Sequence, residues 1–502
     1  MTAQQSIEYE IVIGLEVHSQ LLTESKMFCA CSAAYQDAPP NTTVCAVCLG
    51  MPGAMPVMNQ KAVDFVIRTG LALGCEISAI TKFDRKNYPY PDLMKGYQIS
   101  QYDQPVAHGG CLNIETDDGE KSIGVTRVHL EEDVAKLFHR ADDFGESYSL
   151  LDINRAGVPL MEIVSEPDMR SPDEARSYLT QLQSILRYIG VSSANMEEGN
   201  FRCDANISVR PLGSAEFGAK VEIKNMNSFR AVHRALSYEA ERQVLAVKEG
   251  ELIVQETRGW DDATATTFTQ RTKEYAHDYR YFPEPDLPPL AIEDGWVQAV
   301  RDVLPELPAA RRQRLMTQYG LSEYDANLLT INKATADYYE SVVSAKGESG
   351  KSGDATEKFA KQVSNWTLTE LGRLLNETNG DIEGIRITPQ HFADLLYMVE
   401  GGALSSSMAK TVFEQMYNTG KAPESIAEEQ GLVQISDTDA LGDAVDEAIA
   451  SNPKPVAEYL EGKDQAIRFL VGQVMKITRG KANPQLVMQL LQERLDAIRQ
   501  SA

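Results

Sequence analysis

A proline-rich run, FPEPDLPPL at residues 282–290, divides the chain into two parts with different hydrophobic patterns. Closely spaced prolines break both helices and strand pairing, so we expect no regular element to continue through this run. Before it, short alternating segments, Gly/Pro turns and aromatic residues predict strands, whereas from about residue 295 apolar residues recur with the helical period. The sequence therefore predicts an α+β fold, with an antiparallel-sheet part followed by a helical part.

Helical periodicity continues to the end of the chain. It is clear in WVQAVRDVLPELPAARRQRLMTQYG, in TADYYESVVSA and in ANPQLVMQLLQERLDAIRQ. In the last segment Asn483 is a candidate N-cap, Pro484 takes the first helical position, and Leu486, Leu490 and Leu491 share one face. Because 502 residues exceed what one hydrophobic core normally supports, we expect two or three domains.

Charge and hydropathy exclude several classes of protein. The net charge of −25 argues against a protein that coats nucleic acid indiscriminately. No stretch approaches the roughly 20 apolar residues that span a bilayer. The first ten residues, MTAQQSIEYE, lack the basic start and apolar run of a signal peptide. We therefore expect a cytoplasmic protein.

One local segment is nevertheless basic. Between residues 465 and 481 there is no acidic residue, and four basic residues occur there: Arg468, Lys476, Arg479 and Lys481. Two interpretations remain open, a solvated helix face and a local RNA-binding site.

Polar residues occupy one face of three predicted strands. In YEIVIGLEVHSQL, alternation places Tyr9, Ile11, Ile13, Leu15 and Val17 on the core face. The opposite face then carries Glu16 and His18 side by side. The same alternation gives polar faces in NFRCDANISVRP, with Arg202, Asp204 and Asn206, and in AKVEIKNMNSF, with Lys220, Glu222 and Lys224. The segment RVHLEEDVAKL adds Glu131, Glu132 and Asp133.

These residue types are the ones that bind a hard cation and a phosphate. If the strands share one sheet, their polar faces line one concave surface that suits phosphoryl transfer. For any single strand a solvated face explains the pattern equally well, as it does for the acidic run. His18 has two possible roles, since histidine is a poor Mg²⁺ ligand and a better one for Mn²⁺ or Zn²⁺: it binds the metal, or it orients a ligand or water.

Four of the seven cysteines form two close pairs: Cys29 with Cys31, and Cys45 with Cys48. The pairs are separated by 13 residues, a layout typical of a closed Cys₄ zinc site. A disulfide is disfavoured in a cytoplasmic protein, and a redox role lacks the usual βαβ setting. Because four thiolates leave zinc no open position, the predicted zinc is structural. Four unligated thiols are the alternative.

Several long motifs together resemble the B subunit of aspartyl/glutamyl-tRNA amidotransferases, the GatB family. They are VIGLEVHSQL, DRKNYPYPDLMKGYQISQYDQPV, INRAGVPLMEIVSEPDMRSPDEA, NMEEGNFRCDANISVRP and KVEIKNMNSFRAVHRALSYEAERQ, with ETRGWDD and DYRYFPEPDLPPL at the end of the same domain. The resemblance spans nearly the whole chain. It implies a cradle-like catalytic domain over residues 1–293, a helical domain over 294–404 and a helical YqeY-like tRNA-binding tail over 405–502.

The resemblance also implies a reaction. A GatB subunit uses ATP and Mg²⁺ to phosphorylate the side-chain carboxylate of Glu-tRNA(Gln) or Asp-tRNA(Asn), and ammonia then forms the amide. The ammonia comes from glutamine hydrolysed in the A subunit, and a small C subunit completes a heterotrimer. The Ser–Ser–Lys signature of the A-subunit hydrolase does not occur here. The rival hypothesis is a tRNA-binding scaffold without a catalytic site, whose polar faces bind RNA or another subunit.

Site residues follow from the matched motifs. Glu16 and His18, with Glu131 or Glu132, resemble the family's metal-binding group. Asp204 and Glu222 are candidates for metal binding or for an ammonia relay. Candidates for stabilising phosphate or transition-state charge are Lys86, Arg202, Asn206 and Lys224. Tyr88 and Tyr90 are candidates for stacking on ATP or on the acceptor-end adenine, with core packing or an ordinary turn as the alternative for each. For the tail, the resemblance favours the RNA role of the four basic residues.

Overall fold

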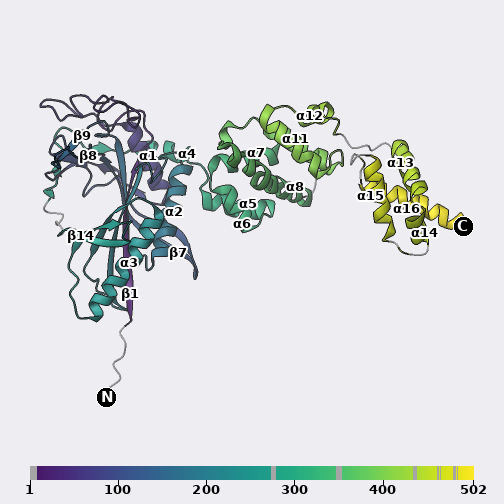
Figure 1. The fold of residues 1–502 in the computed structure, drawn as a ribbon. Coiled ribbons are helices and arrows are strands. Elements are labelled where there is room, and N and C mark those ends of the chain that lie inside the picture. Colours follow the sequence, from purple (N-terminus) through teal and green to yellow (C-terminus); the bar gives the residue numbers. More distant parts are fainter. Residues whose placement is uncertain are drawn as a thin grey trace, which may run out of the picture. The chain divides into compact units, whose positions relative to one another are not determined.

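The computed structural model describes residues 8–272, 279–345, 353–432, 438–460, 463, 465–478, 482 and 484–501 (Figure 1). The chain divides into two compact units, Met1–Pro308 and Ala309–Ala502, and each is described by itself.

A nine-stranded sheet forms the centre of the first unit, in the order β14-β13-β12-β11-β1-β10-β7-β6-β2. The strands are β1 Tyr9–Gln20, β2 Glu76–Ile77, β6 Ala107–Thr116, β7 Gly119–Glu132, β10 Pro159–Ser165, β11 Phe201–Pro211, β12 Val221–Met226, β13 Glu256–Asp261 and β14 Thr266–Thr272. Neighbours are antiparallel except β12 and β13, which are parallel. The predicted α+β fold is confirmed, with this one difference in the sheet: helix α3 (Phe229–Lys248) provides the crossover that a parallel pair needs.

The described residues of the first unit also form three smaller sheets. Strands β4 (Asp84–Asn87) and β5 (Tyr97–Ser100) pair with each other, and β8 (Lys136–Ala141) forms a hairpin with β9 (Ser147–Asp152). The proline-rich run contributes a two-residue strand at each end: β15 (Phe282–Pro283) pairs with β4, and β16 (Leu290–Ala291) pairs with β3 (Ile80–Thr81). The run therefore packs back on the first unit, which continues to Pro308.

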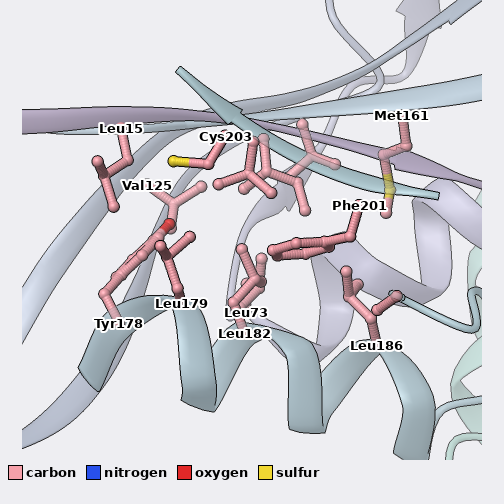
Figure 2. Packing of buried hydrophobic residues seen from close by; sticks show 14 of the residues in the cluster. Leu15, Leu73, Val125, Met161, Tyr178, Leu179, Leu182, Leu186, Phe201 and Cys203 are labelled. Carbon is pink, nitrogen blue, oxygen red and sulfur yellow. The ribbon is translucent and has the colours of Figure 1, made fainter. Parts of the chain in front are cut away.

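Helices cover the apolar face of the sheet. Helix α1 is Gln60–Ala72, α2 is Pro172–Tyr188, and both contribute buried residues to the same core as α3. Figure 2 shows Tyr178, Leu179, Leu182 and Leu186 of α2 directed at residues of the sheet. Most of the strand residues expected in the core are found there, including Ile13, Leu15 and Val17 of β1 and Phe201, Cys203 and Ala205 of β11, whereas Ile11 is only partly buried and Tyr9 lies outside the cluster. The polar faces therefore lie on the opposite side.

Local sequence explains where α2 begins. The side chain of Ser171 accepts a hydrogen bond from the backbone N–H of Glu174, and Pro172 occupies the first helical position. Asp173 and Glu174 lie in the first turn, where the helix dipole favours negative charge. These first residues thus define where the helix begins.

The remaining elements are helices. They are α4 Asp294–Asp302, α5 Pro308–Tyr319, α6 Glu323–Thr330, α7 Lys333–Ser344, α8 Gly353–Trp366, η2 Thr367–Leu371, α9 Gly372–Thr378, η3 Ile382–Gly384, α10 Pro389–Glu400, α11 Ser406–Thr419, α12 Pro423–Glu429, α13 Thr438–Ser451, α14 Pro453–Leu460, α15 Ala466–Ile477 and α16 Pro484–Ser501. None of the helices in the described ranges combines the length and apolarity that a bilayer crossing needs.

The second unit contains two hydrophobic clusters, one from Leu315 to Ala427 and one from Leu441 to Leu495. Leu404 and Ala409 belong to the first of them, so the predicted boundary between residues 404 and 405 falls inside a cluster. The division of the chain into functional domains stays a prediction. Helix α16 begins at Pro484 as expected and buries Leu491, whereas Asn483 lies outside the described residues.

The buried side chain of Glu239 connects α3 to β13 and β14 at one end of the sheet. Glu239 is inaccessible to solvent and pairs with Arg242 on its own helix and with Arg258 of β13, whose Nε lies 3.5 Å from Glu239 Oε2. The same carboxylate accepts hydrogen bonds from Gln243 and Thr267, each at 2.9 Å. This network holds the helix that makes the parallel crossover possible.

We expect Glu239→Ala to destabilise the first unit by about 1–3 kcal/mol, because Gln243 and Thr267 lose a buried acceptor and Arg258 loses an acidic partner while keeping Glu256. Thermal unfolding measures the change. Glu241→Ala, on the exposed side of the same helix, is the matched control and should leave the transition in place. Equal transitions for the two variants would contradict a stabilising role for this network.

Candidate active site

One row of directly opposed residues crosses four strands on the polar face of the sheet. The register of β1 pairs His18 with Arg202 of β11 and with Glu162 of β10, and Glu162 in turn pairs with His129 of β7. In an antiparallel pair, directly opposite residues have side chains on the same face. The two predicted residues His18 and Arg202 are thus brought together, and the register adds two residues that the sequence interpretation missed.

This row lies in a cavity of about 480 Å³. Nine of the residues predicted from the sequence line it: Glu16, His18, Lys86, Tyr88, Glu131, Arg202, Asp204, Glu222 and Lys224. Other polar or aromatic lining residues were not predicted as site residues: Gln98, Gln101, Tyr102, Arg127, His129, Asp133, Glu162, Lys220, Thr257, Tyr279 and Tyr281. Glu132, Asn206 and Tyr90 are not among the lining residues.

Three side chains at the centre of the cavity could hold a metal ion. His18 Nε2 lies 3.2 Å from Glu162 Oε2 and 4.0 Å from Glu131 Oε2, and the three ligand atoms lie within 4.8 Å of one another. Two carboxylate oxygens suit Mg²⁺ or Mn²⁺, whereas the imidazole nitrogen favours Mn²⁺, and three ligands leave coordination positions for substrate. The sequence signal for Glu162 was present: it is the single acid in the apolar strand PLMEIVS.

Charges of opposite sign balance one another around this trio. Burial alone would raise the pKa of Glu131, but Lys86, 3.6 Å away, and the neighbouring His129 lower it to about 2. Burial likewise opposes ionisation of Glu162, yet His129 and His18 hold its pKa well below the usual range. For His18, burial disfavours the charged form, but Glu162 and Glu131 raise its pKa overall. The cavity thus keeps two buried carboxylates ionised.

A second group of charges lies beside the trio. Lys224 Nζ pairs with Asp204 and lies 3.4 Å from Glu222 Oε1, and Thr257 donates a hydrogen bond of 2.9 Å to Glu222. Burial would lower the pKa of Lys224, but Asp204 and Glu222 raise it. Glu16, directly opposite Asp204, accepts a 2.9 Å hydrogen bond from Asn206. Two carboxylates therefore share one ammonium group at this side of the cavity.

Aromatic rings form another wall. Lys86 Nζ lies 5.5 Å from the centre of the Tyr279 ring, which makes an edge contact with Tyr88 at 5.9 Å. Tyr102 and Tyr281 stack with their ring centres 4.4 Å apart. Tyr279 and Tyr281 reach this wall because the adjoining β15 pairs with β4. The predicted Tyr90 has 55% of its surface exposed and lies outside the wall.

Strand alternation separates the two neighbouring glutamates of β7. Glu131 faces the cavity, whereas Glu132 pairs with Lys95 and accepts a 2.9 Å hydrogen bond from the backbone of Ile99. Of the two candidates that the sequence left open, the structure places Glu131 with His18 and engages Glu132 elsewhere.

Asn206 lies in a neighbouring groove of about 260 Å³. Its walls are largely apolar and include Val12, Val164, Pro167 and Phe217. Glu16 and Lys220 line both this groove and the polar cavity. A ligand with a charged end and an apolar end could therefore occupy both spaces.

The four predicted cysteines lie together. Their sulfur atoms fall within 4.8 Å of one another, with Cys48 Sγ 3.6 Å from Cys29 Sγ and 3.8 Å from Cys45 Sγ, and none of the four is in a disulfide. The buried Lys26 ammonium lies 3.5 Å from Cys48 Sγ. Hydrogen bonding from Cys29, with a contribution from Lys26, lowers the pKa of Cys48 to about 4. Four clustered sulfurs next to a cation fit a tetrahedral zinc ion.

The basic residues predicted for the tail are described in part. Arg468 and Lys476 are exposed on α15, on the side away from its buried residues Ile467, Leu470 and Val474. Arg479 and Lys481 lie outside the described residues.

Comparison with known proteins matches both units. Residues 11–298 match the GatB/GatE catalytic domain family, and residues 351–495 match the GatB domain family. A relative from Dehalococcoides mccartyi is 56% identical over 491 residues, which cover 97% of this chain and 99% of the relative. Relatives from Carboxydothermus hydrogenoformans and Moorella thermoacetica are 53% and 54% identical, with 97% of this chain covered and 99% and 100% of the relatives. All three carry the name of the B subunit of an aspartyl/glutamyl-tRNA(Asn/Gln) amidotransferase. At this identity and coverage, the chain belongs to the GatB family.

Proposed function

We propose that this chain is the B subunit of a tRNA-dependent amidotransferase and that its polar cavity is the amidation site. The substrate is Glu-tRNA(Gln), Asp-tRNA(Asn) or both, and the products are Gln-tRNA(Gln) and Asn-tRNA(Asn). The observation that carries this proposal is the trio of His18, Glu131 and Glu162, which lies next to the cations Lys86 and Arg202 in one cavity. Carboxylates and cations on one surface are what ATP-dependent activation of an acid requires.

The chemistry explains why both signs of charge are needed. A carboxylate is a poor acyl donor, so transfer of a phosphoryl group from ATP to the side chain provides a leaving group. Glu131 and Glu162, with His18 as a ligand or as the group that orients water, would hold a divalent cation, Mg²⁺ in this proposal, which would neutralise phosphate charge. Lys86 and Arg202 are placed to stabilise the remaining negative charge of the phosphates. The wall of tyrosines and buried side chains limits access of water, which would hydrolyse an acyl phosphate.

The second group of charges suits the amidation step. Ammonia becomes a cation when it attacks a carbonyl carbon, and it must then lose a proton. Asp204 and Glu222 are two ionisable carboxylates that share Lys224, and they are proposed to orient ammonia and accept that proton. The ammonia is proposed to come from a glutaminase A subunit in a heterotrimer with a small C subunit, which makes this chain part of a carbon–nitrogen ligase.

The apolar groove is proposed to take the nucleoside part of ATP. It shares Glu16 and Lys220 with the cavity that would hold the phosphates. Phe217 is 62% exposed at its wall and can stack on a base. Tyr88, in the lining of the polar cavity, is proposed to make an aromatic contact with ATP or with the acceptor-end adenine.

We expect Glu162→Gln and His18→Ala each to lower tRNA-dependent ATP cleavage by about 100-fold, because each removes a group that would stabilise transition-state charge. Glu16→Gln tests the acid that the sequence predicted beside His18. The assay uses the complex with an inactivated glutaminase and free ammonium, so that only the phosphorylation and amidation steps are measured. Glu120→Gln, at the exposed start of β7, is the matched control.

The same variants distinguish the enzyme from the scaffold hypothesis. An enzyme subunit should keep its affinity for tRNA while the phosphorylation step is lost. A scaffold would lose tRNA affinity, with no selective loss of phosphorylation. Wild-type ATP cleavage in Glu162→Gln or His18→Ala would remove that residue from the proposed site.

We expect freshly purified protein to contain zinc and Cys45→Ser to lose it, because a tetrahedral site with three sulfur ligands binds zinc less tightly. Zinc is measured by elemental analysis and stability by thermal unfolding with and without chelator. Cys111→Ser is the control, since Cys111 is exposed and lies outside the cluster. If freshly purified protein contains no zinc before any chelator is added, the alternative of four unligated thiols is correct.

For the tail, we expect Arg468→Glu with Lys476→Glu to weaken tRNA binding, since two phosphate contacts become repulsive. The loss should shrink as salt rises, and the slope of log affinity against log salt should fall by about 1 per residue. Lys454→Glu, exposed on α14, controls for a general change in charge. Unchanged affinity in the double variant would reject a tRNA role for this face of α15.

A further inference from the structure

The cavity wall contains a buried acid that none of the roles above uses. Asp133 is 2% exposed, and its Oδ2 lies 3.0 Å from Nη2 of the partly exposed Arg202. Its Oδ1 accepts a 2.9 Å hydrogen bond from the backbone of Val134 and lies 3.6 Å from Arg155 Nε. Burial raises the pKa of Asp133, but Arg202 and Arg155 outweigh it and lower the pKa. The position of the Arg202 guanidinium in the cavity therefore depends on where Asp133 is held.

A first set of hydrogen bonds connects Asp133 to the cysteine loop, which we define as residues 29–48. Gln20 is 6% exposed, and its Nε2 donates to Asp133 Oδ2 at 2.7 Å and to the Tyr35 hydroxyl at 3.1 Å. The Tyr35 hydroxyl also lies 3.4 Å from Gln20 Oε1. Tyr35 belongs to this loop, between the two cysteine pairs in the sequence.

A second set of hydrogen bonds connects the same loop to the segment before Arg155. Asn41 has a left-handed backbone, with φ at 60°, and its side-chain oxygen accepts a 2.8 Å hydrogen bond from the backbone of Ile153. Its backbone N–H donates to Asp152 Oδ1 at 3.2 Å, and Thr43 donates to Asn154 Oδ1 at 2.8 Å. The loop thus fixes residues 152–154 from one side.

Arg155 returns this second connection to Asp133. Its Nε donates to the carbonyl of Val134 at 2.8 Å and its Nη2 to that of Ala135 at 2.9 Å. Both carbonyls follow directly after Asp133 in the chain. The first set of hydrogen bonds thus connects the cysteine loop to the side chain of Asp133, and the second connects it to the two residues that follow Asp133.

We propose that Tyr35 is a positioning residue for Arg202, acting through Gln20 and Asp133, so that the cysteine loop sets the cationic wall of the cavity. The Tyr35 hydroxyl contacts both Nε2 and Oε1 of Gln20, so it restricts the side chain whose Nε2 donates to Asp133. Without the hydroxyl the Gln20 side chain moves more freely, Asp133 is held less firmly, and Arg202 loses a fixed partner. The use of this wall for nucleotide rests on the proposed function, whereas the positioning itself does not.

The direct test measures the reactivity of Arg202 toward phenylglyoxal in the full-length chain, quantified by peptide mass spectrometry. We expect Arg202 to be modified several-fold faster in Tyr35→Phe and in Gln20→Ala than in the wild type, because the guanidinium spends less time paired with Asp133. Tyr9→Phe, at the other end of β1, is the matched control and should react like the wild type. Zinc content and the thermal transition of Tyr35→Phe should stay unchanged, which separates positioning from a collapsed loop. Wild-type reactivity of Arg202 in Tyr35→Phe overturns the proposal.

A second measurement tests whether Tyr35 affects ligand binding by positioning Arg202. In the complete complex, we expect Tyr35→Phe to raise the dissociation constant of a non-hydrolysable ATP analogue by about 3–10-fold, and to change it no further in an Arg202→Ala background. A full effect of Tyr35→Phe in that background means that Tyr35 acts elsewhere, and it overturns the proposal. If the wild-type complex binds no analogue, the proposed function fails, and the phenylglyoxal result still decides the positioning.

Discussion

The row formed by Arg202, His18, Glu162 and His129 depends on the register of β1 between β10 and β11. Side chains alternate along a strand, so the residues that build the core and the residues that build the cavity are interleaved in the same segments. A slip of one residue in β1 would turn His18 into the core and Leu15 into the cavity. The packing of Leu15 and Val17 against the helices therefore positions the chemistry as much as the polar residues do.

Burial of so many charges is tolerated because they are paired. Glu131 and Glu162 share His18, His129 and Lys86, and the carboxylates next to them share Lys224. A lone buried carboxylate would bind a proton to avoid its desolvation cost, and a protonated carboxyl is a poor metal ligand. The pairing keeps the oxygens negative while leaving lone pairs directed into the cavity. Such a balanced cluster is prepared to receive both a cation and a polyanion.

Much of this site follows from the sequence, because strand alternation is a local property. It placed Glu16 with His18, and Asp204 between Arg202 and Asn206, and the register then put these faces side by side. Glu162 was missed because it is a single acid in an apolar strand, and its importance appears only when β10 is paired with β1. The choice between Glu131 and Glu132 depends on which face of the sheet each residue points to, and this is known only once β7 is paired with β10. Tyr279 and Tyr281 reach the cavity because the adjoining β15 pairs with β4, which is distant in sequence. No local pattern encodes such a contact.

The short pairings of β15 with β4 and of β16 with β3 have a consequence for synthesis of the chain. The aromatic wall is closed by residues next to the proline-rich run, which is made after all nine strands of the central sheet. A nascent chain that has extended through β14 can already pair all nine strands of the sheet, but its cavity still lacks that wall. Since domains fold as units during translation, the ribosome must release the proline-rich run before the cavity is complete. Before then, Tyr279 and Tyr281 lack the pairing of β15 with β4 that holds them at the cavity.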